Sequence, residues 1–453
     1  MTYKEICDIV YNIEKCKNLF DVKVDNYCIW DVIRYNIINE IVNGNFNKYY
    51  NKSSKVSFFK KIKIIIAYLR SYFYIEINLK AKKWLFFSAS RNIDYSGNLI
   101  DVASQNLKLY LKSNMIILES YANLKNNYNY HKRILILFAK LKYFDISKYK
   151  NSARYFSTII ANAFNIDRKE IYNKIIKLFW RYEFDKWYFQ RILKKVKPKA
   201  VFLTQDGIQK GLIYSCKKKN IPIFECQHGF INKYHPAYSY PSDVEYKNNI
   251  ATPDFLLLFS NYWKNQFFMP NTNVVVIGND YFADPLHTLN QKGNIEQINY
   301  LLVVSSDLHQ LDLEPIINEI LNSSNINIIL KLHPNQRYNY KNIILKYKKY
   351  NQIQVILNEI SISKLIKNAK CLLLIQSTAC YEAINFGKPV IILKRGNYNL
   401  DTEIFTIPGV YLVNSSKEII KIIEMQPFEK VKKTIFFEPF DPTPLKQIGL
   451  MGE

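Results

Sequence analysis

The sequence predicts an α/β protein in which two doubly wound domains face each other across a cleft, preceded by an N-terminal helical extension. A chain of 453 residues is too long for a single hydrophobic core. Its hydrophobic content of 48% is sufficient for two cores. From residue 84 onward, short apolar runs that end in polar residues or glycine alternate with helical stretches, a pattern typical of buried parallel strands.

The helical extension is predicted over residues 1–80. Apolar residues recur at intervals of three and four in NYCIWDVIRYNIINEIV, as expected of a helix with one buried face. From Lys52 to Lys83, nine basic residues accompany one acid, Glu76. Two interpretations stay open for this stretch: a helix lying on anionic lipid, or a core-facing helix with a solvated basic side.

The first α/β domain is predicted over residues 81–245, with helices between about 100 and 195. Its expected strands are WLFFS, AVFL and IPIFEC. The second of these ends in Gln205, Asp206 and Gly207, and the third ends in Gln227, His228 and Gly229. Ligands bind outside the carboxyl ends of parallel strands, so we expect Asp206 and His228 to lie near one crevice.

The second α/β domain is predicted over residues 255–428, after a linker at about 240–254. Residues 429–453 are expected to pack back on the first domain. The predicted strands of the second domain are PDFLLLFS, NVVVIGND, YLLVVSS, INIILKLHP, QVIL, CLLLIQS and KPVIIL.

Two of these strands end in polar clusters. Lys331, His333 and Pro334 form the first cluster, and Ser377 and Thr378 form the second. A helix is expected to begin at the second cluster and to end at Gly387, and its free backbone N–H groups suit a phosphate. Glu382, one turn into this helix, is positioned for a ribose. The structural alternatives are an ordinary N-cap for the hydroxyls, a hydrogen-bonded core histidine for His333 and turn residues for Asp206 and His228.

Composition limits the classes of binding partner and the cellular compartment that we expect for this protein. The formal net charge of +25 favours an anionic partner, but zinc-finger spacing, RNP-type aromatic motifs and basic-region heptads are missing, so we predict no nucleic acid. The seven cysteines include no C-x-x-C pair and are typical of reduced cytosolic thiols. The N-terminus does not resemble a signal peptide, and no apolar run reaches the roughly 18 residues of a membrane span.

The ordered motifs QDG (205–207), QHG (227–229), KLHP (331–334) and QST with EAINFGKPV (376–390) resemble those of bacterial cell-surface glycosyltransferases of the GT-B type. The capsule Kdo transferases and the bacterial polysialyltransferases are most similar, and the CDP-glycerol glycerophosphotransferases are more distant. The resemblance extends over about residues 84–440.

The resemblance implies a nucleotide on the C-terminal domain, bound by Lys331, His333, Pro334, Ser377, Thr378 and Glu382. It implies Asp206 as catalytic base and His228 and His333 as further catalytic residues. The polysialyltransferase motif has two acids before its glycine, whereas this chain has Gln205 and Asp206. The remaining motif residues are expected at the donor or acceptor sugar: Gln205, Gly207, Gln227 and Gly229.

Glycosyl transfer needs a base for the acceptor hydroxyl and positive groups for the leaving phosphate. Imidazole, hydroxyls and a helix terminus meet the second need without a metal, and no D-x-D sequence lies beside the motifs. Asp280 and Asp307 are more typical of strand-end turns than of metal ligands. We therefore predict no cofactor and no metal, with the nucleotide sugar as co-substrate.

The predicted function is transfer of a nonulosonate such as sialic acid or Kdo from a CMP-activated donor to a glycan or glycolipid acceptor of a capsule or lipopolysaccharide. The protein is expected to be cytoplasmic and peripheral on the inner face of an anionic membrane. Two alternatives stay open. One is a CDP-polyol phosphotransferase or a UDP-sugar transferase or epimerase on the same fold, and the other is a non-catalytic nucleotide-sugar-binding scaffold.

Overall fold

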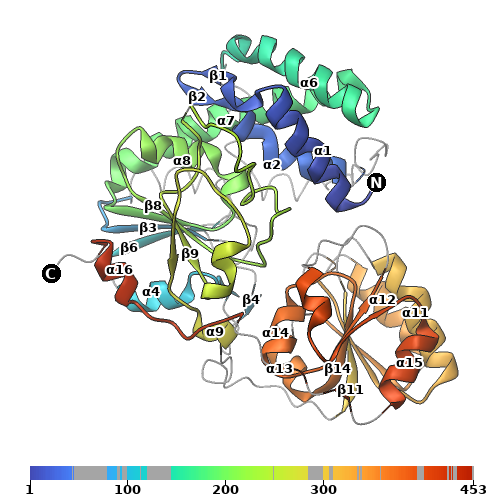
Figure 1. Cartoon of the computed structure of the whole chain (residues 1–453). Coiled ribbons are helices and arrows are strands. Elements are labelled where there is room, and N and C mark those ends of the chain that lie inside the picture. The colour runs from blue at the N-terminus through green and yellow to red at the C-terminus, as the bar shows by residue number, and fades with distance from the viewer. Residues whose placement is uncertain are drawn as a thin grey trace, which may run out of the picture.

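Two six-stranded parallel sheets, each covered by helices, form the framework of the protein in a computed structural model (Figure 1). The structure describes residues 1–42, 44, 79–88, 92–93, 99–112, 114–119, 144–247, 249–283, 299–305, 310–333, 336, 339–357, 359–394, 402–425, 428–429, 431 and 436–450. The predicted Pro334 and Asp307, and residues 52–78 of the basic stretch, lie outside this part of the chain.

The first sheet has the order β10-β9-β8-β7-β3-β6. Its strands are β3 (Trp84–Ser88), β6 (Met115–Glu119), β7 (Ala200–Leu203), β8 (Ile223–Cys226), β9 (Phe255–Leu258) and β10 (Asn273–Val276). Phe86, Phe202, Phe224 and Phe255 stack across four neighbouring strands, with ring centroids 4.5 to 5.3 Å apart. Such cross-strand aromatic contacts stabilise the sheet and its register. The direction in which successive strands are added reverses between β3 and β7.

The second sheet has the order β13-β12-β11-β14-β15-β16. Its strands are β11 (Tyr300–Val304), β12 (Ile328–Lys331), β13 (Ile353–Ile356), β14 (Ala369–Leu374), β15 (Val390–Leu393) and β16 (Val410–Val413). This is the doubly wound order in which the first three strands run one way from the centre and the last three run the other way. The reversal lies between β11 and β14, where such sheets bind ligands.

Sheet membership changes the predicted domain boundary. The sequence prediction began the second domain at residue 255, but β9 and β10 pair within the first sheet, so the chain changes domain between β10 and β11. Strand β6 lies in a region predicted to be helical, and β16 was not predicted. Buried parallel strands are similar apolar runs, so their sequences do not specify which sheet they join.

The N-terminal helices form a layer over one end of the first domain (Figure 1). They are α1 (Tyr3–Cys16) and α2 (Ile29–Val42), which pack with α6 (Lys150–Phe164) and the long α7 (Arg168–Val196). A capping box between Thr2 and Glu5 starts α1.

Short elements complete the first domain. Near the N-terminal helices these are η1 (Leu19–Asp21), β1 (Lys23–Val24), β2 (Tyr27–Cys28) and η2 (Ser147–Tyr149). Around the first sheet lie β4 (Asn92–Ile93), β5 (Leu99–Ile100), α4 (Gln105–Leu111), η3 (Asp206–Ile208), α8 (Lys210–Lys217), η4 (Asn261–Asn265) and α9 (Asp280–Ala283).

Helices cover both faces of the second sheet. On the face nearer the first domain lie α13 (Ile362–Asn368) and α14 (Ala379–Asn385), as Figure 1 shows. The other face packs against α11 (Gln310–Ser323), α12 (Tyr340–Tyr347) and α15 (Ser416–Glu424). The segment η6 (Thr402–Thr406) precedes β16. The prediction of two doubly wound α/β domains is confirmed.

The last part of the chain lies against the first domain. The N–H of Asp441 donates to the carbonyl of Ile277, and Leu445 of α16 (Thr443–Gln447) is buried among side chains of the first sheet. Gly278 has a φ of +69°, and a Cβ at this position would lie 1.9 Å from the carbonyl oxygen of Pro439. Only glycine fits where the returning segment crosses β10. None of the helices in the described ranges is long and apolar enough to cross a membrane.

Candidate functional site

Asp206 lies at the carboxyl end of β7, but its side chain is directed into the protein. It is fully buried, and its Oδ2 accepts a hydrogen bond from Lys210 Nζ at 3.1 Å. Burial raises the pKa of Asp206, and the ammonium of Lys210 offsets part of this effect. Asp206 therefore does not contact an acceptor hydroxyl directly in this conformation, which corrects the expectation that it is the base.

Lys210 links three segments of the chain beneath this position. Three further acceptors lie within hydrogen-bond distance of the Lys210 ammonium, which has three hydrogens to share among them and Asp206: Asp31 Oδ1 at 3.1 Å, the Tyr240 hydroxyl at 3.3 Å and the carbonyl of Ala251 at 3.0 Å. Burial lowers the pKa of Lys210, but Asp206 and Asp31 outweigh this effect and hold the pKa above its ordinary value. One buried cation thus holds two buried carboxylates together.

A third buried carboxylate, Glu225, connects this network to His228. Glu225 Oε1 accepts the N–H of Asp206 at 3.2 Å and the hydroxyl of Tyr238 at 2.5 Å. The same hydroxyl lies 3.0 Å from Nδ1 of His228, which is half-buried. Burial, followed by the charge of Asp206, raises the pKa of Glu225 well above its ordinary value. His228 is the partly exposed end of a buried polar chain.

The QHG turn brings His228 toward the second domain. Gln227 is buried, with its amide donating to the carbonyl of Gly229 and accepting the N–H of Phe259, both at 2.9 Å. A Cβ on Gly229 would lie 3.6 Å from Cγ2 of Thr378, and the ring of Phe230 stacks on Tyr381 at 5.9 Å. The QHG and QST motifs, about 150 residues apart in the sequence, therefore meet in space.

Two residues predicted at a sugar have structural roles instead. Gln227 holds the turn through both ends of its amide, and its burial removes it from any ligand surface. A Cβ on Gly207 would lie 2.6 Å from Cγ of Tyr35, so this glycine allows α2 to pack closely. Gln205 is half-buried with a φ of +63°, and its contact with a sugar stays a prediction.

His333 follows β12 and is held by Gln336. The Gln336 side chain accepts the N–H of His333 at 2.7 Å and donates to Ser305 Oγ, beyond β11, at 3.1 Å. Lys331 was predicted at the nucleotide, but its buried ammonium donates to the carbonyl oxygens of Leu332 and Leu357. Burial lowers the pKa of Lys331 to about 8. Lys331 therefore fixes the strand end, and His333 is left as the half-buried side chain of this cluster.

Ser377 and Thr378 follow β14, beside the reversal point of the second sheet. Ser377 Oγ accepts the N–H of Ala379 at 3.2 Å, whereas Thr378, the N-cap residue of α14, makes no side-chain cap hydrogen bond. Thr378 is exposed and Ser377 is half-buried. The helix ends before Gly387, whose φ is +68°, as predicted.

Glu382 was predicted to contact a ribose, and the structure corrects this. The side chain is 4% exposed, and its Oε2 accepts a hydrogen bond from Ser363 Oγ of α13 at 3.1 Å. Burial raises the pKa of Glu382 to about 7. The sequence shows that Glu382 lies one turn into a helix, but it does not show that this face packs against α13.

The structure thus separates the site residues into two groups at the carboxyl ends of strands, one in each domain, which we call the first edge and the second edge. The first edge comprises Asp206, Glu225 and His228, and the second edge comprises His333, Ser377 and Thr378. Sequence reasoning missed Glu225, Tyr238, Lys210, Asp31 and Gln336. A carboxylate inside the apolar strand IFEC was the available signal, because a charged residue in a buried strand requires a partner.

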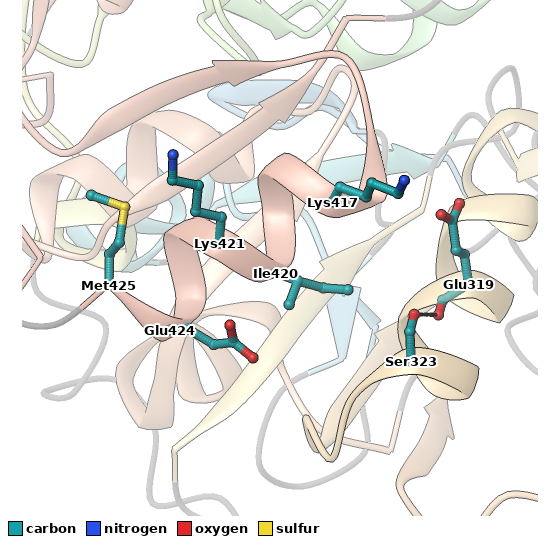
Figure 2. Close-up of a pocket in the computed structure, with 7 residues that line it drawn as sticks. All are labelled: Glu319, Ser323, Lys417, Ile420, Lys421, Glu424 and Met425. Carbon is teal, nitrogen blue, oxygen red and sulfur yellow. Dashed lines mark hydrogen bonds between the residues drawn. The ribbon is translucent and has the colours of Figure 1, made fainter.

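Other candidate sites lie apart from the two edges. Asp280 accepts hydrogen bonds from Asn106 and from the N–H of Phe440, as expected of a structural strand-end residue. In the described ranges, no group of three or more His, Cys, Asp or Glu side chains is arranged to hold a metal ion. A shallow pocket of about 510 Å³ lies between α11 and α15 (Figure 2). Its lining, which includes Glu319, Lys417 and Lys421, contains no predicted site residue.

Residues 308–402 match the family model described as capsule polysaccharide biosynthesis protein. This stretch includes all of the second edge. No curated protein matches the chain. Similar solved structures include the UDP-GlcNAc 2-epimerase of Methanocaldococcus jannaschii in complex with UDP-GlcNAc and UDP, at 14% identity and a TM-score of 0.47, covering 78% of this chain and 96% of that chain. The glycosyltransferase SnogD of Streptomyces nogalater shows 10% identity and a TM-score of 0.44, with coverage of 76% and 91%.

Proposed function

We propose that the protein is a GT-B glycosyltransferase of bacterial surface-polysaccharide synthesis, with a CMP-nonulosonate as donor. The observation that carries the proposal is the meeting of the two edges at Gly229 and Thr378, with His228 next to the contact. The family match over residues 308–402 supports a role in capsule synthesis. The acceptor is a glycan or glycolipid, and no cofactor other than the nucleotide sugar takes part.

In this proposal, the first edge removes the acceptor proton. His228 replaces Asp206 as the base, because Asp206 is fully buried and paired with Lys210, whereas the imidazole is half-buried. The proton of the acceptor hydroxyl passes to His228 as the oxygen attacks the anomeric carbon of the sugar. Asp206 contributes by supporting Glu225 and the loop that carries His228.

The second edge receives the nucleotide phosphate. His333 and the hydroxyls of Ser377 and Thr378 stabilise the charge that grows on the phosphate as it leaves. Ser305 and Gln336 hold His333 in place from β11. All of these residues lie at or next to the reversal point of the second sheet, where the crevice of a doubly wound sheet receives a ligand.

The cellular setting belongs to the same proposal. We infer that the protein acts in the cytoplasm on the inner face of the membrane, where acceptors for surface polysaccharides are assembled. The net charge of +25 supports attraction to anionic lipid. Flotation with liposomes that contain or lack anionic lipid tests this placement, and equal recovery from both would contradict it.

A nucleotide screen tests the donor. CMP, CDP, UDP and GDP are compared by the shift in melting temperature that each produces, since a ligand at 100 times its Kd stabilises a protein by about 2.7 kcal/mol. We expect the strongest shift with CMP, followed by release of CMP from CMP-sialic acid or CMP-Kdo when acceptor glycan is added. A dominant shift with UDP would favour a UDP-sugar enzyme, and a CMP shift without turnover would favour a scaffold.

A matched pair of variants sharpens the screen. His333→Ala removes a residue of the second edge and should abolish the shift with CMP. Lys417→Ala lies on α15 in the pocket of Figure 2, within the same domain, and should keep the shift. Equal shifts in both variants would contradict the placement of the nucleotide at the second edge.

A further inference from the structure

Tyr238 forms a bridge between a buried carboxylate and a half-buried imidazole. Its hydroxyl donates to Glu225 Oε1 at 2.5 Å and lies 3.0 Å from His228 Nδ1. Tyr238 is 1% exposed and Glu225 is fully buried. Nothing in a doubly wound fold requires a carboxylate inside β8, and burying one without a direct cation is costly.

The direction of these hydrogen bonds determines the tautomer of His228. The Tyr238 hydroxyl donates its hydrogen to Glu225 Oε1, which also accepts the backbone N–H of Asp206. The only hydrogen of the tyrosine hydroxyl is therefore directed toward Glu225. The contact with His228 then requires that Nδ1 carry a hydrogen, which leaves the lone pair of the neutral ring on Nε2.

We propose that Tyr238 and Glu225 are positioning residues that hold His228 in its Nδ1–H tautomer, so that Nε2 accepts the proton of the acceptor hydroxyl. The proposal rests on the role of His228 given above. In the transfer step, the O–H bond of the acceptor breaks and an Nε2–H bond forms, while the acceptor oxygen forms a bond to the anomeric carbon and the bond between that carbon and the donor phosphate breaks. The electron pair of that bond leaves with the phosphate.

Charge favours the same arrangement. Lys210 is paired with Asp31 and Asp206, and in the described part of the chain no cation forms an ion pair with Glu225. One oxygen of Glu225, Oε2, has no hydrogen-bond partner there. When His228 becomes an imidazolium, its charge faces Glu225 through the Tyr238 hydroxyl. Burial favours the neutral form of Glu225, so a positive charge on His228 favours ionisation of Glu225, and the two charges then stabilise each other across the Tyr238 hydroxyl.

A second histidine of the same loop provides an internal reference. His235 Nδ1 accepts the N–H of Ala237 at 3.3 Å, so its hydrogen resides on Nε2. Burial lowers the pKa of His235 to about 3, which keeps this ring neutral in ordinary buffers. The two histidines should therefore show opposite tautomers in one spectrum.

The test is imidazole ¹⁵N NMR of the full chain, with the His228 signals identified by their loss in His228→Ala. We expect the Nδ1–H pattern for His228 and the Nε2–H pattern for His235. Tyr238→Phe should shift His228 toward Nε2–H, whereas Tyr246→Phe should leave it unchanged. Tyr246 is the matched control, because its hydroxyl bonds the carbonyl of Pro241 in the same loop and does not contact His228.

The tautomer is measured without donor or acceptor, so its outcome is independent of the nucleotide screen. An Nε2–H pattern for His228 in the natural protein, or an unchanged pattern in Tyr238→Phe, would overturn the inference. With an active donor, Tyr238→Phe should lower kcat on the order of 10²-fold at unchanged KM. Equal kcat values in Tyr238→Phe and Tyr246→Phe would also overturn it.

Discussion

The two edges that meet at Gly229 and Thr378 are built differently. The first edge contains two buried carboxylates, Asp206 and Glu225, and beneath it lie a third, Asp31, and a buried cation, Lys210. At the second edge the partly or fully exposed groups are an imidazole and two hydroxyls, and the neighbouring buried Lys331 bonds backbone carbonyls. The raised pKa values of Asp206 and Glu225 are typical of groups that transfer protons, whereas neutral donors at strand ends suit an anion.

The N-terminal helices support the residues around the first edge. Asp31 of α2 bonds both Lys210 and Tyr240. Arg34 of the same helix pairs with buried Glu14 of α1 and donates to the carbonyls of Pro236 and Ser239. The helical layer therefore supports the loop that carries His228 and Tyr238, and so it contributes to the candidate site as well as to the core of the first domain.

The largest expected effect separates the chemistry of the two edges. His228→Ala should lower the transfer rate by about 10²- to 10⁴-fold, because the base is lost, while keeping the CMP-induced shift in melting temperature. His333→Ala should lose that shift. Transfer assays and thermal-shift measurements on both variants test whether His228→Ala loses transfer but keeps CMP binding, and whether His333→Ala loses CMP binding. Loss of CMP binding in His228→Ala would show that proton removal and nucleotide binding are not separated between the two edges.

The charge network of the first edge predicts a large loss of stability in Lys210→Met. Removal of the cation leaves Asp31 and Asp206 buried without it, at a cost of about 3–5 kcal/mol in the free energy of unfolding. Denaturant unfolding measures this value.

Lys217→Met on the same helix is the control. Lys217 is 21% exposed and pairs with the partly exposed Asp254, so its loss should cost about 1 kcal/mol or less. Similar losses in the two variants would mean that the buried network does not contribute more than a surface ion pair.

Glu382, a buried acid among the described residues of the second domain, should titrate in a way that changes the stability of the fold. Burial raises the folded-state pKa of Glu382 to about 7 from its ordinary value of 4.5, so between these values the folded protein binds more protons than the unfolded chain. Stability should therefore fall as the pH rises through this window, by roughly 3 kcal/mol, and level off above pH 7.

Glu382→Gln keeps the side-chain shape and should flatten this part of the pH profile. Glu424→Gln, at an exposed position on α15, should leave the profile unchanged. Urea unfolding from pH 5 to pH 8 measures the difference, and an unflattened profile in Glu382→Gln would show that Glu382 does not cause the slope.

The smallest effect concerns the support of His333. Gln336→Ala leaves the His333 N–H and Ser305 without this partner, which should cost about 1–3 kcal/mol in stability and weaken CMP binding. Gln352→Ala, whose amide bonds the carbonyl of Ser324 in the same domain, should keep CMP affinity. Isothermal titration of both variants distinguishes support of the second edge from a general loss of packing.

Local sequence patterns predicted most strands of the two sheets and the end of a helix at Gly387. Strands such as Tyr300–Val304 and Val390–Leu393 are apolar runs ended by polar residues, and Gly387 ends its helix in the left-handed conformation as expected. The assignment of β9 and β10 to the first sheet was missed, because strand pairing depends on segments far apart in the sequence. The direction of Glu382 was missed for the same reason: its partner, Ser363, belongs to another helix.

The sequence by itself determined the two doubly wound domains and the positions of Asp206, His228, His333 and Ser377 at strand ends, because strand periodicity and turn chemistry are local. Tertiary structure decided which of these side chains stay accessible. Asp206 is buried and paired with Lys210, which also binds Asp31 of α2. His228 contacts Tyr238, whose hydroxyl bonds Glu225 of β8. Burial and charge pairing arise only when distant segments pack together, so the proposed base could be identified only in the folded protein.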